Sequence, residues 1–449
     1  MQLDLTRGDI RRHIKTLALP ACIGFFFHTL FNITDTYFAG MISTQALAAL
    51  SLSFPIFFII ISVAGGMSEA VTAVVGNALG EGDEARARHI AKNALLFGAL
   101  LAALLTAAGY ASAPLLLREL GAQDAYLAEA LSYINLIIYG TGLFVFTFFI
   151  NALLNAVGDT VSFRNVLVFA SMVNVLLDAW FVHGGMGIGA MGVSGIALAT
   201  VLIEAMSVLY LSYRFVTKPL YAQRCAFRFD AAVVKELVVQ GIPPSANMGL
   251  MAVGIYIITY FAAPFGQEVV AAYGIGMRIE QIILMPAVGL NVAVLAIVAQ
   301  NSGGRLYTRI SETIERSLYY GGVVALFGGM TLLLGAEWVM GVFSHSPDVI
   351  REGALYLRVE AFLIFPFVVI FTYVAMLQGI KRPAFIFYIS LARQVAAPLI
   401  VLGLLARAGF GVFSVWLGIG GIVVFAALLT RWYARRTLAS LKQSSRARD

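Results

Sequence analysis

The chain has 449 residues, of which 60% are hydrophobic and only 12% are charged, and its formal net charge is +6. Soluble domains carry about 25% charged residues, so this composition excludes a soluble globular protein. The positive charge does not indicate a nucleic-acid-binding protein, because the basic residues lie in loops between long apolar segments, where they orient membrane proteins.

Twelve apolar segments follow one another along the chain. Each has the length of about 20 residues that a helix needs to cross a hydrocarbon core about 30 Å thick. Their composition is continuously apolar rather than alternating, which favours helices over a transmembrane barrel. The first is too long for a signal peptide and no cleavage site follows it, so we expect it to be retained. We predict an all-α polytopic membrane protein with spans at 14–39, 46–76, 88–111, 126–153, 162–182, 191–214, 236–263, 268–299, 308–335, 348–376, 384–405 and 412–433.

The loop charges predict the orientation of these spans. If the N-terminus is cytoplasmic, 24 of the 30 Lys and Arg residues fall on the cytoplasmic side. Four fall outside (Arg118, Arg351, Arg358 and Arg407), and Arg278 and Arg393 lie within spans. Because positive residues concentrate on the cytoplasmic side of membrane proteins, both termini are predicted to be cytoplasmic.

The sequence repeats at a spacing of about 223 residues: LALPA around Pro20 matches QGIPP around Pro243, and TYFAG at Thr36 matches TYFAA at Thr259. The predicted halves are 1–225 and 226–449, with six spans each. An even number of spans returns the chain to the same side, so the halves are expected to be parallel repeats about an axis normal to the membrane. Two such lobes around a central cavity are typical of secondary transporters. A purely structural anchor is the alternative, but the sequence contains no extramembrane domain for it to hold.

Asp35 is an acid within the first predicted span, at a depth where a charge costs about 2.5–3.5 kcal/mol on insertion scales. Its counterpart in the repeat is Ile258, so the fold does not require an acid at this position. Asp178 in the fifth span is a second such acid, and Asn174 lies four residues earlier on the same helical face.

Asp35 and Asp178 are predicted to reach a similar depth in the outer leaflet of the same lobe. Two carboxyl groups beside an amide in a low-dielectric cavity do not both ionise freely. The two acids can therefore hold one proton between them, or bind a small cation when both are ionised. Tyr133 and Thr200 are further candidate members of this ion-coupling site. For these two, hydrogen bonding between helices is the alternative role.

Other residues are candidates for movement and for substrate binding. Pro20 removes a backbone hydrogen bond from the first span and is a candidate hinge, with a static kink as the alternative. Phe144, Phe148, Asn151 and Met172 are candidate cavity residues, because aromatic and thioether groups suit bulky apolar or cationic ligands. Lipid contact and core packing are the alternative for these four.

The sequence contains no GxxxxGK[ST] loop and no HExxH motif, and its five histidines are scattered. We therefore predict no ATPase, no catalytic residues, no metal site and no cofactor. A membrane-embedded enzyme or a channel is a further alternative. The absence of a nucleophile–base pair or a metal motif argues against the enzyme.

These features resemble the multidrug and toxic compound extrusion (MATE) family, and within it the DinF-like bacterial branch. The resemblance extends from about Thr16 to Tyr433. It rests on LALPACIGFFFHTLFNITDTYFAG from Leu17, GNALGEGD from Gly76, NVLLDAWF from Asn174, GVSGIALATV from Gly192 and RIEQIILMPAVGLNVAVLAIVAQNSGG from Arg278.

The resemblance implies two six-helix lobes and antiport of organic cations or other drugs against inward H⁺ or Na⁺. The family's first-helix Asp matches Asp35, its fifth-helix Asn and Asp match Asn174 and Asp178, and its Tyr and Thr match Tyr133 and Thr200. Another branch carries an acid in the seventh helix, but 244–265 contains none here, so that site is not carried over.

The predicted function is therefore secondary active efflux of drug-like organic cations or other amphiphiles, driven by inward H⁺ through protonation of Asp35. Na⁺ coupling is an alternative. A lipid-linked precursor flippase is another, against which the few intramembrane basic residues, Arg278 and Arg393, argue. The expected protein is a monomer in the bilayer of a bacterial inner membrane and binds no nucleic acid.

Overall fold

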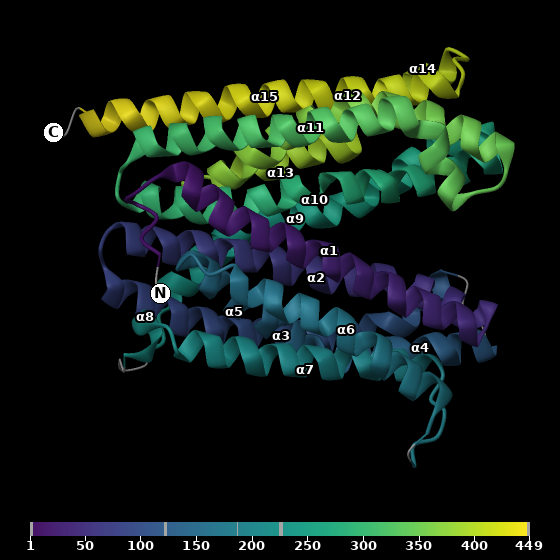
Figure 1. Ribbon diagram of the computed structural model, residues 1–449, viewed down its shortest axis with the longest axis horizontal. Coiled ribbons are helices and arrows are strands. Elements are labelled where there is room, and N and C mark those ends of the chain that lie inside the picture. The colour runs from purple at the N-terminus through teal and green to yellow at the C-terminus, as the bar shows by residue number, and fades with distance from the viewer. Residues whose placement is uncertain (1–2, 121–123, 186, 224–227, 447–449) are drawn as a thin grey trace. The chain divides into compact units, whose positions relative to one another are not determined.

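The computed structural model describes residues 3–120, 124–185, 187–223 and 228–446 (Figure 1). Within those ranges every regular element is a helix, apart from an isolated bridge between Gly185 and Ile188. The predicted all-α class is confirmed.

The first part of the chain forms α1 (Ile10–Ile42), α2 (Thr44–Gly80), α3 (Glu84–Glu119), α4 (Asp124–Tyr139), α5 (Thr141–Ala156), α6 (Val161–His183), α7 (Val193–Val216) and the short α8 (Pro219–Ala222). The second part forms α9 (Ala231–Ala262), the short η1 (Ala263–Phe265), α10 (Gln267–Gly303), α11 (Tyr307–Phe343), α12 (Pro347–Gly379), α13 (Ala384–Leu391), η2 (Ala392–Ala396), α14 (Ala397–Arg407) and α15 (Val412–Arg446). Among the described residues, 11 helical segments are long and apolar enough to cross a membrane, and there are 12 when the bent pair α4 and α5 is taken as one span. The predicted twelve spans agree with the second count.

The fourth span is not the single straight helix that we predicted over 126–153. It bends by 43° between Tyr139 and Thr141. Gly140 lies at the bend, and a Cβ atom there would stand 2.7 Å from the Val201 side chain of α7. Glycine weakens the helix and gives α7 room to approach, which explains the position of the bend.

The eleventh span, predicted as one helix over 384–405, contains the π-helical turn η2 between α13 and α14. Pro398 follows this turn. Proline has no N–H to continue the regular α-helical hydrogen-bond ladder, and the turn just before it is π-helical instead.

Several helices extend beyond the apolar segments from which they were predicted, as α3 does at its start and α15 at its end. Hydropathy detects only the part of a helix that matches the hydrocarbon core. Side-chain caps begin the polar extensions: Ser43 Oγ accepts a hydrogen bond from Ala46 N at 2.9 Å, and Asp83 Oδ1 accepts one from Arg86 N at 2.8 Å.

The helices form two compact units. Unit 1 contains Ile23–Ser245 and the residues before Leu5, and unit 2 contains Leu5–Cys22 and Ala246–Asp449. The chain passes from one unit to the other within α1 and again within α9. The boundary predicted from the repeat, between residues 225 and 226, lies outside the described residues and stays a prediction.

Each unit has its own apolar core. In unit 1, α2, α3 and α5 pack together, and a Cβ at Gly98 would approach the Phe149 ring to 3.1 Å. In unit 2, Tyr273 stacks on Trp416 and a Cβ at Gly276 would come within 2.4 Å of Tyr356. Because lipid is as apolar as the side chains, such close packing at small residues holds membrane helices together.

A polar cluster joins the ends of α5, α6 and α7 in unit 1. Asp159, in the loop after α5, accepts hydrogen bonds from Ser162 N at 2.9 Å and from Ser162 Oγ at 2.7 Å. It also forms ion pairs with Lys218 and, at 3.5 Å, with Arg214. Burial by itself raises the pKa of Asp159, but the hydrogen bonds from Lys218 and Ser162 outweigh it, and the pKa of this carboxyl lies below its ordinary value.

We expect Asp159→Asn to destabilise unit 1 by about 3–5 kcal/mol, because it leaves the buried Lys218 ammonium without its counter-charge. Thermal unfolding in detergent measures this difference. Since the folded pKa of Asp159 is lowered, its contribution is fully present above the unfolded pKa of about 3.9 and is lost as the pH falls through the folded pKa. A difference from wild type that vanished already near neutral pH would contradict this assignment.

Candidate functional site

The centre of the candidate site is the side-chain amide of Asn174 on α6. Its Nδ2 donates one hydrogen bond to Asp35 Oδ1 at 2.9 Å and another to Asp178 Oδ2 at 3.1 Å. The two carboxyl groups also lie within hydrogen-bonding reach of each other. All three side chains are buried, and Asp35 is 6% exposed. The amide therefore uses both of its hydrogens to hold two acids that face each other.

The sequence explains this convergence. Asn174 and Asp178 are four residues apart, so they project from one face of α6. Asp35 lies toward the end of α1, and Asp178 lies toward the end of α6. The similar depth predicted for the two acids brings them within reach of the same amide.

Thr200 on α7 adds a weaker contact. Its Oγ1 lies 3.4 Å from Asp35 Oδ2 and 3.1 Å from the carbonyl oxygen of Ile196, one turn earlier on its own helix. A hydroxyl has a single hydrogen, which these two acceptors share. Tyr133 on α4 is buried and lies close enough to Asp35 and Asp178 to interact with their charges.

The site has more acceptor atoms than donors. Asn174 Oδ1 and Asp178 Oδ1 are buried and have no hydrogen-bond partner among the described residues. Within the same part of the chain, no ion pair includes either acid. Such an arrangement can chemically accept a proton or a small cation.

The four predicted cavity residues do not form one cluster. Phe144 is buried and packs edge-on against Phe57 at 5.2 Å, and Phe148 packs partly against the core of unit 1. Asn151 is half-buried, whereas Met172 is 65% exposed. Their role in substrate binding stays a prediction.

The structure also contains acid contacts that the sequence did not predict. In unit 1, Thr147 Oγ1 on α5 donates to Glu204 Oε2 on α7 at 2.7 Å. In unit 2, Tyr356 Oη donates to Glu280 Oε2 at 3.0 Å, and Glu360 is buried nearby. One signal in the sequence could have indicated Glu204. It follows the candidate residue Thr200 by four residues and so lies on the same face of α7.

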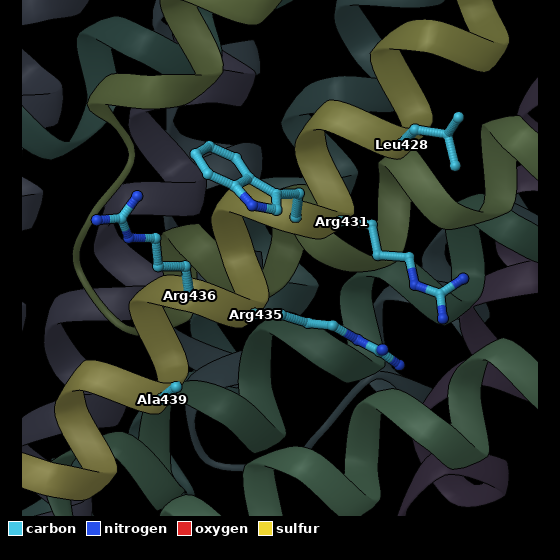
Figure 2. A pocket seen from close by; sticks show the side chains of 6 residues that line it. Leu428, Arg431, Arg435, Arg436 and Ala439 are labelled. Carbon is cyan, nitrogen blue, oxygen red and sulfur yellow. The ribbon is translucent and has the colours of Figure 1, made fainter.

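A hollow of about 480 Å³ lies along the last helix, α15, and is shown in Figure 2. It belongs to unit 2 and its lining contains three arginines but no acid: Leu428, Arg431, Trp432, Arg435, Arg436 and Ala439. None of the predicted site residues lines it. Arg435 Nε donates to Tyr373 Oη at 3.0 Å, which fixes one side of the hollow.

The spans define a polytopic membrane protein, and unit 1 buries a pair of acids bridged by one amide. The MatE family model matches residues 20–180 and again 243–403. The chain therefore belongs to the MatE family of membrane transporters. The two matched segments begin 223 residues apart, which is the spacing of the internal repeat.

Relatives cover almost the whole chain. A protein named FAD transporter from Shewanella oneidensis is 28% identical over 403 residues, 89% of each chain. A probable multidrug resistance protein NorM from Thermotoga maritima is 24% identical over 433 residues, covering 94% of this chain and 91% of its own. A structure described as the outward-facing conformation of a multidrug resistance MATE family transporter superposes with a TM-score of 0.92 at 23% identity, covering 98% of this chain and 99% of its own. At that identity the superposition shows the shared fold.

We expect Asn174→Ala to lower the thermal midpoint in detergent at alkaline pH, because it removes the donor to both acids and costs about 1–3 kcal/mol. Asp178→Asn should be much less harmful, since it removes one of two like charges and retains a polar group. Ser53→Ala is the control, because among the described residues the buried Ser53 hydroxyl bonds only the Ala49 carbonyl of its own helix. Equal midpoints for Asn174→Ala and Ser53→Ala would contradict the bridging role.

Proposed function

We propose that this protein exports drug-like organic cations or other amphiphiles in exchange for inward H⁺, and that the Asp35–Asn174–Asp178 cluster is the coupling site. The observation that carries the proposal is the buried acid pair bridged by one amide. A carrier must alternate between a charged and a neutralised site if ion binding is to bias its conformation. Two facing carboxyl groups in an apolar surrounding offer that change of charge.

The geometry supports the following protonation cycle. With one proton shared, the pair carries one negative charge that the Asn174 amide and the Thr200 hydroxyl stabilise. Loss of that proton leaves two negative charges held by a single amide, which favours a rearrangement of α1 relative to α6. An incoming cationic substrate or a new proton relieves the same repulsion, so the two compete.

The position of the amide favours H⁺ over Na⁺. Nδ2 of Asn174 occupies the place between the two carboxyl oxygens where a bridging cation would bind. A sodium ion held by both acids would require Asn174 to turn its oxygen toward them, because cations of this kind bind oxygen ligands. A proton requires no such rotation.

Pro20 supports a hinge in α1. The chain passes from unit 2 to unit 1 between Cys22 and Ile23, directly after Pro20. Proline removes a hydrogen bond from the ladder at this point, so bending there costs less than elsewhere in the helix. We propose that protonation of Asp35, farther along the same helix, is coupled to this bend.

The orientation and location are part of the proposal. The loop charges support cytoplasmic termini, and the bacterial relatives support an inner membrane. In that orientation Asp35 lies in the outer half of unit 1, where an external proton arrives first.

The FAD transporter among the relatives favours a second candidate function, the export of a flavin dinucleotide. The two functions differ in the charge of the cargo, because the dinucleotide carries phosphates and the drugs are cationic.

Purified protein in liposomes tests these assignments. A proton gradient directed opposite to drug movement should drive transport of a fluorescent organic cation without Na⁺, and Asp35→Asn should reduce the rate by roughly a hundredfold or more, since it removes the proton carrier. Ser53→Ala should transport as wild type does. Transport by Asp35→Asn at the wild-type rate would refute the coupling assignment, and strict dependence on Na⁺ would refute H⁺ coupling. Flavin dinucleotide as the only transported cargo would establish the second candidate.

A further inference from the structure

Glu204 is a further acid within the spans of unit 1, and the proposed coupling site does not use it. It lies near the middle of α7 and is half-buried. Its Oε2 accepts a hydrogen bond of 2.7 Å from Thr147 on α5. Residues four apart on a helix are neighbours on one face, with Cβ atoms about 5–6 Å apart, so Glu204 lies one turn from Thr200, whose hydroxyl contacts Asp35.

The charge of an ionised Glu204 has little compensation. Among the described residues no ion pair includes it, and its hydrogen-bond donor is a neutral hydroxyl. The helices packed against α7 contribute the titratable groups Tyr133 on α4 and Asp178 on α6, which belong to the coupling site. The remaining cations nearby are at helix ends, and one of them, Arg214, is paired with Asp159.

A structural role would be to tie α5 to α7. A glutamine or a serine would make that bond without the cost of a carboxylate in lipid, which is about 2.5–3.5 kcal/mol for an acid at a helix centre. The uptake and release of a proton is a function that a glutamine or a serine could not perform, and it explains an acid at this depth.

Polar side chains continue from Glu204 toward one end of unit 1. Thr147, Asn151 and Asn155 follow one another every four residues on α5, so they lie along one face of that helix. Asn151 Oδ1 is buried and has no hydrogen-bond partner within the described part of the chain. This series of polar residues ends near the loop after α5, where Asp159 forms its ion pair with Lys218.

We propose that Glu204 is a proton relay that connects the Asp35–Asn174–Asp178 cluster with the Asp159 end of unit 1. This inference rests on the proposed function and extends it with an exit path for the proton. In the transfer, the O–H bond on Asp35 or Asp178 breaks and an O–H bond forms on a Glu204 oxygen, with an intervening water or the Thr200 hydroxyl passing the proton. Glu204 then releases the proton to water along the Asn151 and Asn155 side of α5, and its carboxylate is restored.

The test uses the full-length protein in liposomes with the same gradient-driven cation transport. Glu204→Gln keeps a hydrogen-bonding group beside Thr147 but carries no proton. We expect it to bind the organic cation with wild-type affinity and to transport it roughly tenfold more slowly or worse. Glu204→Asp should restore most of the rate with an altered pH profile. Ser207→Ala is the matched control, because Ser207 lies on the same helix and its hydroxyl bonds only the Ile203 carbonyl within the described part of the chain.

Chemical rescue separates a relay from a structural contact. In Glu204→Ala, added formate should restore proton-driven transport, because a small weak acid can carry the proton in place of the missing carboxyl. A merely structural role would not respond to formate.

The outcomes separate this inference from the function it rests on. If the wild-type protein shows no proton-driven transport, the proposed function fails. If the wild type transports and Glu204→Gln matches it in rate and pH profile, the relay is wrong. If the Glu204 variants fail to fold, the relay is tested with Thr147→Val, which removes only the hydroxyl that donates to Glu204. An altered pH profile of transport in this variant supports the relay, and an unchanged profile overturns it.

Discussion

The interaction on which the rest of the structure depends is the pair of hydrogen bonds by which the Asn174 amide bridges two acids in an apolar helix bundle. Water would solvate these carboxyl groups anywhere on a soluble protein, but lipid cannot, so each acid must find its donors within the protein. For Asp35 those donors come from two other helices, Asn174 on α6 and Thr200 on α7. The contacts that hold the acids therefore also connect α1, α6 and α7 in unit 1.

The sequence predicted this cluster because its signals are local. The spacing from Asn174 to Asp178 is one helical turn, and the loop charges give the depth and direction of each span. The pair of Thr147 and Glu204 was not predicted, because hydropathy gives the position of a helix along the chain but not its rotation against a neighbour. The bend at Gly140 was missed for a similar reason: glycine is common inside membrane helices, and only the approach of Val201 shows that this one is needed.

Comparison of the two repeats distinguishes features that both halves share from features present in one half alone. The prolines recur at equivalent positions, Pro20 in α1 and Pro243 in α9, and both lie close to where the chain passes between the units. The acid does not recur, since Ile258 stands where Asp35 would be. Unit 2 instead places the half-buried Glu280 on α10 and the buried Glu360 on α12 around Tyr356. Backbone features are thus shared by the two halves, whereas the placement of charge is specific to each.

The polar groups of unit 1 differ in what satisfies them. The hydroxyls of Thr29, Thr34 and Thr36 donate to carbonyls four residues earlier on α1, so their own helix satisfies them. A carboxylate has no hydrogen to donate to such a carbonyl, and the amide hydrogens of its helix are already used in the backbone ladder. Asp35 and Glu204 must therefore recruit donors from other helices, and any motion that separates those helices changes how well each acid is stabilised. Under the proposed function, that stabilisation determines where a proton resides, and the same contacts would couple helix movement to proton movement in unit 1.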